Sequence, residues 1–498
     1  MVERAALEKR YSDDIGIRGS NPLTSANMSI KNLPIIKIFS HEYQIKEEQG
    51  RRLIKIFASE KIFDSLEKEV FNQAVNVASL PGLAGPICLM PDSHVGYGAP
   101  IGTVFAMKED RGYISPGAIG YDINCGMRLI ITNLTYKEIK PFIKKIVDRL
   151  FEEIPTGLAK KGFLKVNKKE LKNLVEKGVH YLVNNINIGW EEDIKNIEEE
   201  GQIKGADFQS VSQQAIERGL SQLVTLGSGN HYLEIQRVEK IFDKKLAEKY
   251  KICQEGQIGI MIHCGSRGFG HQVCSDYLKI FKKHASKFKI NLKDWQLICA
   301  PINSSIAKNY IKAMSSAANF AFVNREVISH KVREIFARVL GGSPEKYLMK
   351  LICDVAHNIG KWEIHQIPET NRKEKVFVHR KGATRSFPNQ PIIIGGSMET
   401  GSYLLEGHKE SLEKSYGSTA HGSGRTMSRE KAKKVIKAEK LWNEMLKKEI
   451  YVRSLSFSGL AEEAGVAYKD INEVIETVEK NNLSTPVAYF RPLGNIKG

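Results

Sequence analysis

The sequence predicts one large domain of the mixed α+β class, because two apolar patterns alternate along the chain. Short apolar runs that end at glycine-rich turns, such as 129–131 and 258–262, are typical of buried strands. Longer segments with apolar side chains on one helical face, such as 59–79, are typical of amphipathic helices. No linker-like composition follows residue 30. We therefore predict a polar, mobile N-terminal extension over 1–30 and a single domain over 31–498.

The elements expected along the chain follow from the same two patterns. Residues 34–66 contain short apolar runs, which indicate strands with connectors. The Gly- and Pro-rich loop 82–102 contains Asp92 and His94, which form either a hydrogen-bonded turn pair or part of a site. Further helices are expected at 137–152, 167–185, 305–340, 429–448 and 469–481.

Composition and charge narrow the class of protein. Hydrophobic residues make up 42% and charged residues 26% of the 498 residues, which is typical of a globular protein with a sizeable core. Seven scattered cysteines, no signal-peptide core and no long apolar run favour a reducing cytoplasm and no membrane. The net charge of +17 favours a polyanionic partner such as a nucleic acid. The lysines of 160–172 are typical of a solvated face, with contact to a phosphate backbone as the alternative.

The segment 115–128, SPGAIGYDINCGMR, is the clearest candidate for a functional loop. It places three glycines between apolar runs, which lets the backbone approach a ligand closely. Asp122 offers a hard oxygen and Cys125 a soft sulfur within four residues, a combination that suits a divalent metal. A buried cysteine beside a turn-capping aspartate is the equally weighted alternative for this stretch alone.

Five histidines lie in glycine-containing segments near the ends of apolar runs, and these are His231, His263, His357, His379 and His421. Each alone is most often a core or turn residue. Together with Asp122 and Cys125 they form a ligand set that would be costly to bury without a purpose. We therefore predict a metal site built from Asp122, Cys125 and two or three of the histidines. A thiolate between two ions would give the two-metal clamp of phosphoryl transfer, although Cys and His ligands alone favour zinc over manganese.

Three further segments supply the parts of a phosphate cradle. HCGSRGFG (263–270), GGSMETGS (395–402) and HGSGR (421–425) combine backbone amides with hydroxyls and arginines. None is a Walker A loop, and no GxGxxG follows a strand. The K-x-D-G motif of lysine-dependent nucleotidyl transferases is also absent from the sequence. A covalent nucleotide adduct would therefore have to form on a histidine.

Taken together, these motifs resemble one family, the RtcB-type RNA-splicing ligases, which join RNA ends using GTP and manganese. The matching segments run in the family's order from PDSHVGYG (91–98) and SPGAIGYDINCGMR to HGSGRTMSR (421–429) and RPLGNIKG (491–498). The resemblance covers roughly residues 34–498. It implies an RtcB-like catalytic domain over 31–498, with the active site in a central cleft lined by strand ends and Gly-rich loops. It also implies a cytoplasmic protein.

The resemblance implies a role for each matching residue. Asp122, Cys125 and His231 would hold one manganese ion, and Cys125, His263 and His357 a second, so that Cys125 bridges the two. His421 would be the nucleophile that attacks the α-phosphate of GTP. The residues implied to bind GTP are Asn230, His231, Tyr232, Leu233, Glu234, His357, Asn358, Gly395, Gly396, Ser397, Met398, Ser402, His421, Gly422, Ser423, Gly424, Tyr468 and Lys497.

The implied reaction has three steps. GTP guanylylates His421, an RNA 2′,3′-cyclic phosphate is opened and its 3′-phosphate takes the GMP, and a 5′-hydroxyl then displaces the GMP. The implied partners are RNA (tRNA halves or other broken RNA) and an archease-like activating protein. A two-metal phosphatase or nuclease acting on RNA ends is the alternative, and it would need the metals but not His421 or Lys497. A metal-stabilised RNA-binding protein without catalysis is a third hypothesis.

The sequence departs from the usual family pattern at a few positions. Gly395 and Glu399 stand where Pro and Gly are common, and Glu399 adds negative charge beside the predicted phosphate cradle, which would weaken GTP binding. Cys264 replaces a common Thr, and Gly465-Val466 replaces a common Pro-Gly. The catalytic set is intact. Asn124 and Arg128, within the candidate metal loop, are further expected to contact RNA ends or phosphate.

Overall fold

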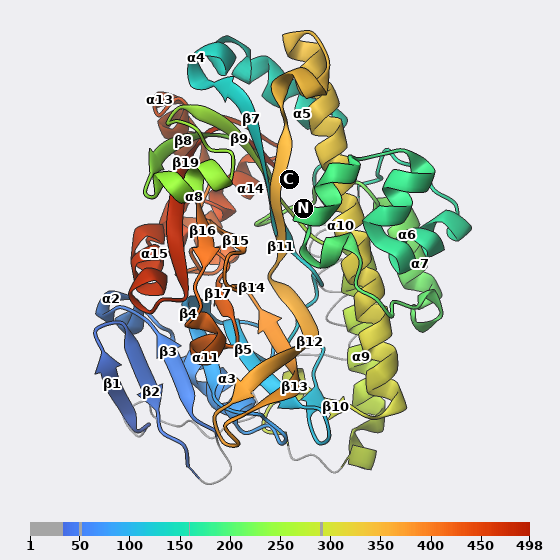
Figure 1. Ribbon diagram of the computed structural model, residues 1–498, viewed down its shortest axis with the longest axis vertical. Coiled ribbons are helices and arrows are strands. Elements are labelled where there is room, and N and C mark those ends of the chain that lie inside the picture. Colours follow the sequence, from blue (N-terminus) through green and yellow to red (C-terminus); the bar gives the residue numbers. More distant parts are fainter. Residues whose placement is uncertain (1–32, 49–51, 159, 289–291) are drawn as a thin grey trace.

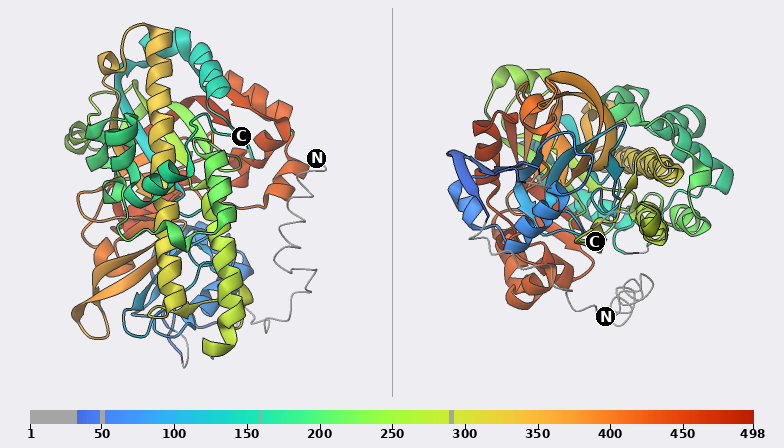
Figure 2. Two further views of the ribbon diagram at one scale, coloured as in Figure 1. Left: turned by 90° about the vertical axis from the view of Figure 1, so that its right-hand side faces the viewer. Right: turned by 90° about the horizontal axis from the view of Figure 1, so that it is seen from below.

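The computed structural model describes residues 33–48, 52–158, 160–288 and 292–498, and it has the predicted mixed α+β character (Figure 1). Two large sheets lie end to end along the long axis, and two long helices run along one flank (Figures 1 and 2). The extension predicted over 1–30 lies outside the described residues. No helix in the described ranges is both long and apolar enough to cross a membrane.

The first sheet has seven strands in the order β1-β2-β3-β4-β5-β13-β12. Its neighbours pair antiparallel, except that β3 and β4 are parallel. The strands are β1 (Ile35–Phe39), β2 (Glu42–Ile45), β3 (Ile54–Phe57), β4 (Ile87–His94), β5 (Ile101–Lys108), β12 (Asn358–Ile367) and β13 (Arg372–Lys381). The short strands expected within 34–66 are therefore confirmed. Strand β4 ends in the segment PDSH, so Asp92 and His94 lie at its carboxyl end.

The second sheet has eight strands, ordered β11-β7-β9-β8-β19-β16-β15, with β18 parallel to β19. The strands are β7 (Gly126–Thr135), β8 (Tyr232–Ile241), β9 (Gln257–Cys264), β11 (Lys350–Ala356), β15 (Pro391–Gly395), β16 (Ser402–Gly407), β18 (Tyr451–Ser454) and β19 (Ser484–Lys497). Two small two-stranded sheets pair β6 (Tyr113–Ile114) with β10 (Ala300–Pro301) and β14 (Ala383–Arg385) with β17 (Ser418–Ala420).

The register of the second sheet gathers the predicted ligands at one end. Gly126 at the start of β7 pairs with Cys264 at the end of β9 and with Ala356 at the end of β11. Tyr232 at the start of β8 pairs with His263. Because β7, β8, β9 and β11 begin or end at this level, the residues just outside their ends converge. The chain also passes from the second sheet to the first here, between β11 and β12, at His357.

The helices follow the predicted ranges with breaks. The helices that lie within the predicted ranges are α2 (Glu60–Asp64), α3 (Lys68–Ala78), α4 (Tyr136–Ile139), α5 (Ile143–Glu153), α6 (Lys168–Tyr181), α10 (Ser305–Leu340), α12 (Arg429–Val435), α13 (Ala438–Lys447) and α15 (Ile471–Lys480). The expected helix over 305–340 is confirmed at both ends. The side chain of Ser304 caps its first turn, and Gly341 follows its last residue.

Helix α9 (Arg267–Phe288) was not predicted, because glycines at its start make the sequence look like a loop. The structure explains these glycines by packing. A Cβ on Gly270 would lie 1.9 Å from Ser266 Oγ, and one on Gly268 would lie 2.7 Å from the Gln222 side chain. The other shorter helices are α7 (Gln213–Gln222), α8 (Lys244–Lys249), α11 (Ser411–Ser415) and α14 (Phe457–Glu462). Helices α9 and α10 lie side by side on the flank (Figure 2).

Candidate active site

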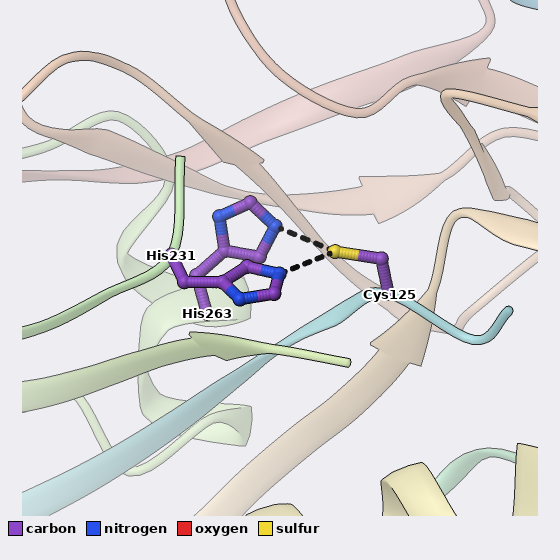
Figure 3. A group of neighbouring side chains, drawn as sticks. All are labelled: Cys125, His231 and His263. Carbon is purple, nitrogen blue, oxygen red and sulfur yellow. Dashed lines mark hydrogen bonds between the residues drawn. The ribbon is translucent and has the colours of Figure 1, made fainter. Parts of the chain in front are cut away.

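The five predicted metal ligands form an unbroken chain of side-chain contacts. His231 Nε2 lies 2.8 Å from Asp122 Oδ2 and 3.3 Å from Cys125 Sγ. On the other side of the sulfur, Cys125 Sγ is 3.3 Å from His263 Nε2, which is 3.3 Å from His357 Nε2. Figure 3 shows the two imidazoles of His231 and His263 converging on the single sulfur atom. The structure therefore brings all five together, with Cys125 in the middle.

Local backbone contacts hold the loop that carries Asp122 and Cys125. The Cys125 amide donates to the Asp122 carbonyl, closing a tight turn, and the Cys125 carbonyl accepts from the His357 amide at 2.9 Å. Asn124 between them has a left-handed backbone (φ 54°), which asparagine tolerates better than most residues. The Asn358 side chain donates to the Asp122 carbonyl at 3.2 Å. The loop is thus fixed to the crossing between the two sheets.

Burial controls the electrostatics of this cluster. Burial raises the pKa of the Cys125 thiol well above its usual value, and it lowers the pKa values of His263 and His357 well below theirs. Burial alone would raise the pKa of Asp122, but the charge and hydrogen bond of His231 outweigh it and lower that pKa. The cluster thus presents carboxylate oxygens, imidazole nitrogens and a sulfur. This donor set fits divalent cations.

His421 sits at the far end of the ligand chain, against a carboxylate. Its ring centroid is 4.8 Å from that of His357, and its Nδ1 is 2.6 Å from Asp92 Oδ2. The same oxygen accepts from the amides of His421 and Gly422 at 3.0 and 3.1 Å. Burial would raise the pKa of Asp92, but the charge and hydrogen bonds of His421 lower it. A proton held on Nδ1 leaves Nε2 with a free lone pair, as a nucleophile requires.

Asp92 and Arg267 are candidate functional residues whose contacts with the site histidines were not predicted from the sequence. For Asp92 the sequence left two hypotheses open, a turn pair with His94 or a place in a site. The structure has both features: the Asp92 carbonyl contacts His94 Nδ1 at 2.9 Å, and the Asp92 carboxylate contacts His421. Arg267 was named only as part of a cradle, yet its Nη1 lies 2.9 Å from His231 Nδ1. The conspicuous PDSH and GSRG motifs were the available signals, but the partner residues are distant in sequence.

Two of the three segments predicted to form a phosphate cradle, 395–402 and 421–425, lie against each other around His421. The third, 263–270, instead begins α9 and contacts the metal cluster through Arg267. The Gly395 amide donates to the His421 carbonyl at 3.2 Å, and the Ser423 amide donates to the Gly395 carbonyl at 3.0 Å. On the opposite side, the Lys469 amide donates to the Gly424 carbonyl at 2.9 Å. A Cβ on Gly395 would lie 2.9 Å from the Tyr232 hydroxyl, so this position has no room for a side chain. The backbones of 395–401, 421–428 and 464–469 therefore line one another.

Of the residues implied to bind GTP, Glu234 and Lys497 lie near the ends of β8 and β19. Lys497 is buried, with its Nζ 5.3 Å from the Tyr232 ring centre and 3.6 Å from a carboxylate oxygen of Glu463. The Tyr468 hydroxyl is hydrogen-bonded to the same Glu463. Glu234 accepts from the side-chain amides of Gln236 and Asn495. Burial raises the pKa of Glu234 to about 7, against the lowering effects of Lys497 and the two amides.

The other residues implied to bind GTP differ in how far they are exposed. Asn230 immediately precedes His231 in a half-buried turn, and Ser402 Oγ lies 3.4 Å from Gln236 Nε2. The side chains of Leu233 and Met398 are in hydrophobic clusters, which leaves their backbones for any ligand contact. Gly396, Ser397, Gly422, Ser423 and Gly424 lie in the cradle segments described above.

The active site was expected in a central cleft at the strand ends. The side chains of Asp122 and His421 are 21% and 14% exposed, whereas the other predicted ligands are almost fully buried. A cavity of about 1010 Å³ between α10, β11 and β12 is lined by none of the predicted site residues. Access to the site is therefore from the side of Asp122 and His421.

The expectation for Asn124 and Arg128 is wrong, and His379 is not among the histidines that join the site. Asn124 and Arg128 do not contact RNA or phosphate, because both are fully buried and bound to protein groups; Arg128 pairs with Glu326 and Asp354. His379 does not join the site, because it is buried in the first sheet and stacked on Phe105 at 4.3 Å. The Cys264 thiol, at the position where the family commonly has Thr, faces the carbonyls of Thr225 and Leu226.

Glu399, expected to weaken GTP binding, is already engaged by other protein groups. Its Oε2 accepts from the Gly465 amide at 2.6 Å, and its Oε1 lies 3.5 Å from Lys448 Nζ. The two departures from the family pattern, at 399 and 465, are thus in direct contact. A proline at 465 would have no N–H to donate. This pair ties the cradle segment 395–401 to the segment that carries Tyr468.

The fold and the site together define a mixed α+β enzyme with a candidate metal cluster beside a carboxylate-held histidine. Comparison with known proteins then identifies the family. The family model described as tRNA-splicing ligase RtcB matches residues 73–498. The tRNA-splicing ligase RtcB of Archaeoglobus fulgidus is 44% identical over 93% of this chain and 98% of the relative. That of Thermococcus kodakarensis is 42% identical over 94% and 99%.

A eukaryotic relative is similar over nearly the same span. RNA-splicing ligase RtcB homolog 1 of Entamoeba histolytica is 43% identical over 89% of this chain and 88% of the relative. The chain therefore belongs to the RtcB family of tRNA-splicing ligases, and it is an RNA ligase. The resemblance inferred from the motifs is confirmed.

Removing the central sulfur of the candidate metal cluster should disrupt metal binding. We expect Cys125→Ala to weaken Mn²⁺ binding by more than about 100-fold, the upper end of the loss seen when a residue that merely supports a ligand is removed. Equilibrium dialysis with metal analysis measures this directly. Cys264→Ala is the matched control, since Cys264 is equally buried nearby but faces away from the cluster. Equal Mn²⁺ affinity in the two variants would contradict the assignment of Cys125.

The contact between Glu399 and Gly465 predicts a coupled pair of substitutions. Gly465→Pro should lower the free energy of unfolding by about 1–3 kcal/mol, because a partly buried, charge-assisted hydrogen bond is lost. In a Glu399→Gly background the same change should be neutral or slightly stabilising. Ala464 already has the extended backbone (φ −62°, ψ 145°) that suits a residue before proline. Urea unfolding of the four proteins gives the coupling energy, and Gly465→Ala, which keeps the N–H, is the control. Equal losses in both backgrounds would argue against the pair.

Proposed function

We propose that this RNA ligase joins 2′,3′-cyclic-phosphate or 3′-phosphate ends of RNA to 5′-hydroxyl ends, using GTP and two Mn²⁺ ions. The observation that carries the proposal is the position of His421. Its Nδ1 contacts Asp92, its ring adjoins His357, and its backbone lies in the cradle of 395–401. A nucleophile between metal ligands and a phosphate cradle suits nucleotidyl transfer. Simple phosphate hydrolysis would not need it.

The residues divide into those that hold metals and those that move a proton. Asp122, Cys125 and His231 would hold one ion, and Cys125, His263 and His357 the other. Two divalent cations at these positions would neutralise charge on the reacting phosphates. Asp92 keeps the proton of His421 on Nδ1, so that Nε2 can attack the α-phosphate of GTP as pyrophosphate leaves. The resulting phosphoramidate then passes GMP to the RNA 3′-phosphate.

In this proposal, three side chains give the selectivity for guanine: those of Glu234, Lys497 and Tyr468. Glu234 can accept from the N–H edge of guanine, and Lys497 can donate to its carbonyl oxygen, whereas adenine presents the opposite pattern. Tyr468 would pack beside the base. The amides of Gln236 and Asn495 orient both oxygens of the Glu234 carboxylate. Guanine donors would further favour its charged form, against the burial that raises its pKa to about 7.

The net charge of +17 supports RNA as the partner. The lysines of the 160–172 run are exposed in the structure, which is compatible with either a solvated face or contact with the RNA backbone. We propose tRNA halves or other broken RNA as the substrate. An archease-like activating protein and a cytoplasmic location remain predictions from the resemblance.

The histidine adduct distinguishes ligation from the alternative two-metal phosphatase or nuclease. Incubation with α-labelled GTP and Mn²⁺ should label the wild-type protein with GMP through an acid-labile, base-stable bond, and His421→Ala should not be labelled. The labelled protein should then join a 2′,3′-cyclic-phosphate RNA to a 5′-hydroxyl RNA. A wild-type protein that processes RNA ends without any adduct would instead support the phosphatase or nuclease.

The contact between Asp92 and His421 predicts a large kinetic effect from a small change. Asp92→Asn removes the charge that favours a proton on Nδ1, so the rate of adduct formation should fall on the order of 10³-fold or more, by analogy with carboxylate–histidine pairs in hydrolases. GTP binding, measured separately by titration, should change little, since an asparagine keeps a side-chain oxygen that can accept from the amides of His421 and Gly422. An unchanged rate in Asp92→Asn would show that the carboxylate does not set the tautomer.

A further inference from the structure

Arg325, in the middle of α10, is fully buried next to the candidate metal cluster and contacts three separate segments of the chain. Its Nη1 donates to the carbonyls of Asn124 and Cys264 at 2.9 and 2.8 Å. Its Nη2 donates to Asn124 Oδ1 at 3.2 Å, and its Nε donates to Asp354 Oδ1 at 2.9 Å. One guanidinium therefore joins the metal loop, the end of β9 and strand β11.

Each of these contacts lies close to a predicted metal ligand. Asn124 directly precedes Cys125, Cys264 directly follows His263, and Asp354 is three residues before His357 at the end of its strand. Gly126, on the other side of Cys125, packs against the same guanidinium: a Cβ there would lie 3.1 Å from Arg325 Cζ. The position of Arg325 thus affects the backbone beside three ligands at once.

We propose that Arg325 is a positioning residue that sets the spacing of Cys125, His263 and His357 and thereby the metal affinity of the site. The proposal rests on the metal site put forward above. The planar fork of the guanidinium offers five N–H donors in fixed directions, so it can meet two carbonyls and a carboxylate simultaneously. A lysine ammonium keeps the charge that Asp354 requires but is a compact point that cannot span these acceptors.

Arg333 provides a matched control on the same helix. It is 1% exposed, its Nη1 and Nη2 pair with Asp193 at 2.6 and 3.0 Å, and its Nε donates to the Met349 carbonyl at 3.1 Å. Its partners, which include Glu326 at 3.8 Å, are not predicted ligands, and Met349 precedes the amino end of β11. Arg333→Lys therefore removes a guanidinium fork of similar burial from α10 without touching the metal loop or the carboxyl ends of β9 and β11, where the predicted ligands lie.

The test compares Co²⁺ binding by the full-length wild type, Arg325→Lys and Arg333→Lys, followed by the thiolate-to-cobalt absorption band and by dialysis. Both variants should lower Tm. Only Arg325→Lys should weaken Co²⁺ binding, by about tenfold or more, as for other residues that hold ligands in place, and alter the absorption band. Equal binding by Arg325→Lys and wild type, or equal weakening in both variants, would overturn the proposal.

A milder variant covers the case in which Arg325→Lys does not fold. Asn124→Gly tolerates the left-handed backbone at this position and removes the Oδ1 acceptor of Arg325. It should give Co²⁺ affinity below wild type, and wild-type affinity in a folded Asn124→Gly protein would count against the proposal. Failure of the metal site itself looks different, because the wild type would then bind no Co²⁺ at the Cys125 thiol.

Discussion

The burial of Cys125 is the constraint on which the rest of the site depends. Its side chain is almost fully buried, with an imidazole nitrogen 3.3 Å away on each side, and burial together with Asp122 raises the pKa of its thiol. A thiolate at this depth is stable only with positive charge against it. Burial lowers the pKa values of the flanking histidines, which favours the neutral imidazole that binds a metal. Arg325 supplies part of this positive charge, because it lowers the pKa of the thiol, and the donors that converge on the sulfur are suited to bringing cations beside it.

The scaffold meets this constraint by coupling the site to the core. The ligands stand at the ends of β7, β8, β9 and β11, so strand register fixes their mutual positions. Beneath them, α10 contributes the buried charges of Arg325 and Glu326, paired with Asp354 and Arg128. Removing one member of such a pair typically costs about 3–5 kcal/mol, because a buried charge is left uncompensated. Site geometry and stability are therefore inseparable in this region.

The residues that converge at the candidate site could be predicted from the sequence, but the residues that hold them in place could not. Strand ends and the 305–340 helix follow from local apolar patterns, and glycine-flanked histidines at such ends meet once the strands pair. The partner of each residue is a tertiary property. His379 and His421 have similar local motifs, yet one stacks on Phe105 and the other meets Asp92, 329 residues away. Arg128 lies within the functional loop but points into the core, and α9 was missed because packing glycines resemble a turn.

The same reasoning applies to residues that differ from the family pattern. A carboxylate beside a phosphate cradle repels an anionic ligand only if its charge faces that ligand. In this chain the Glu399 carboxylate faces the Gly465 amide and Lys448, which oppose its charge. That arrangement requires an N–H at 465, which proline lacks, so the hydrogen bond of Glu399 depends on a residue other than proline at 465. The effect of either departure alone cannot be inferred from its position in the sequence, because it depends on the residue that it contacts in space.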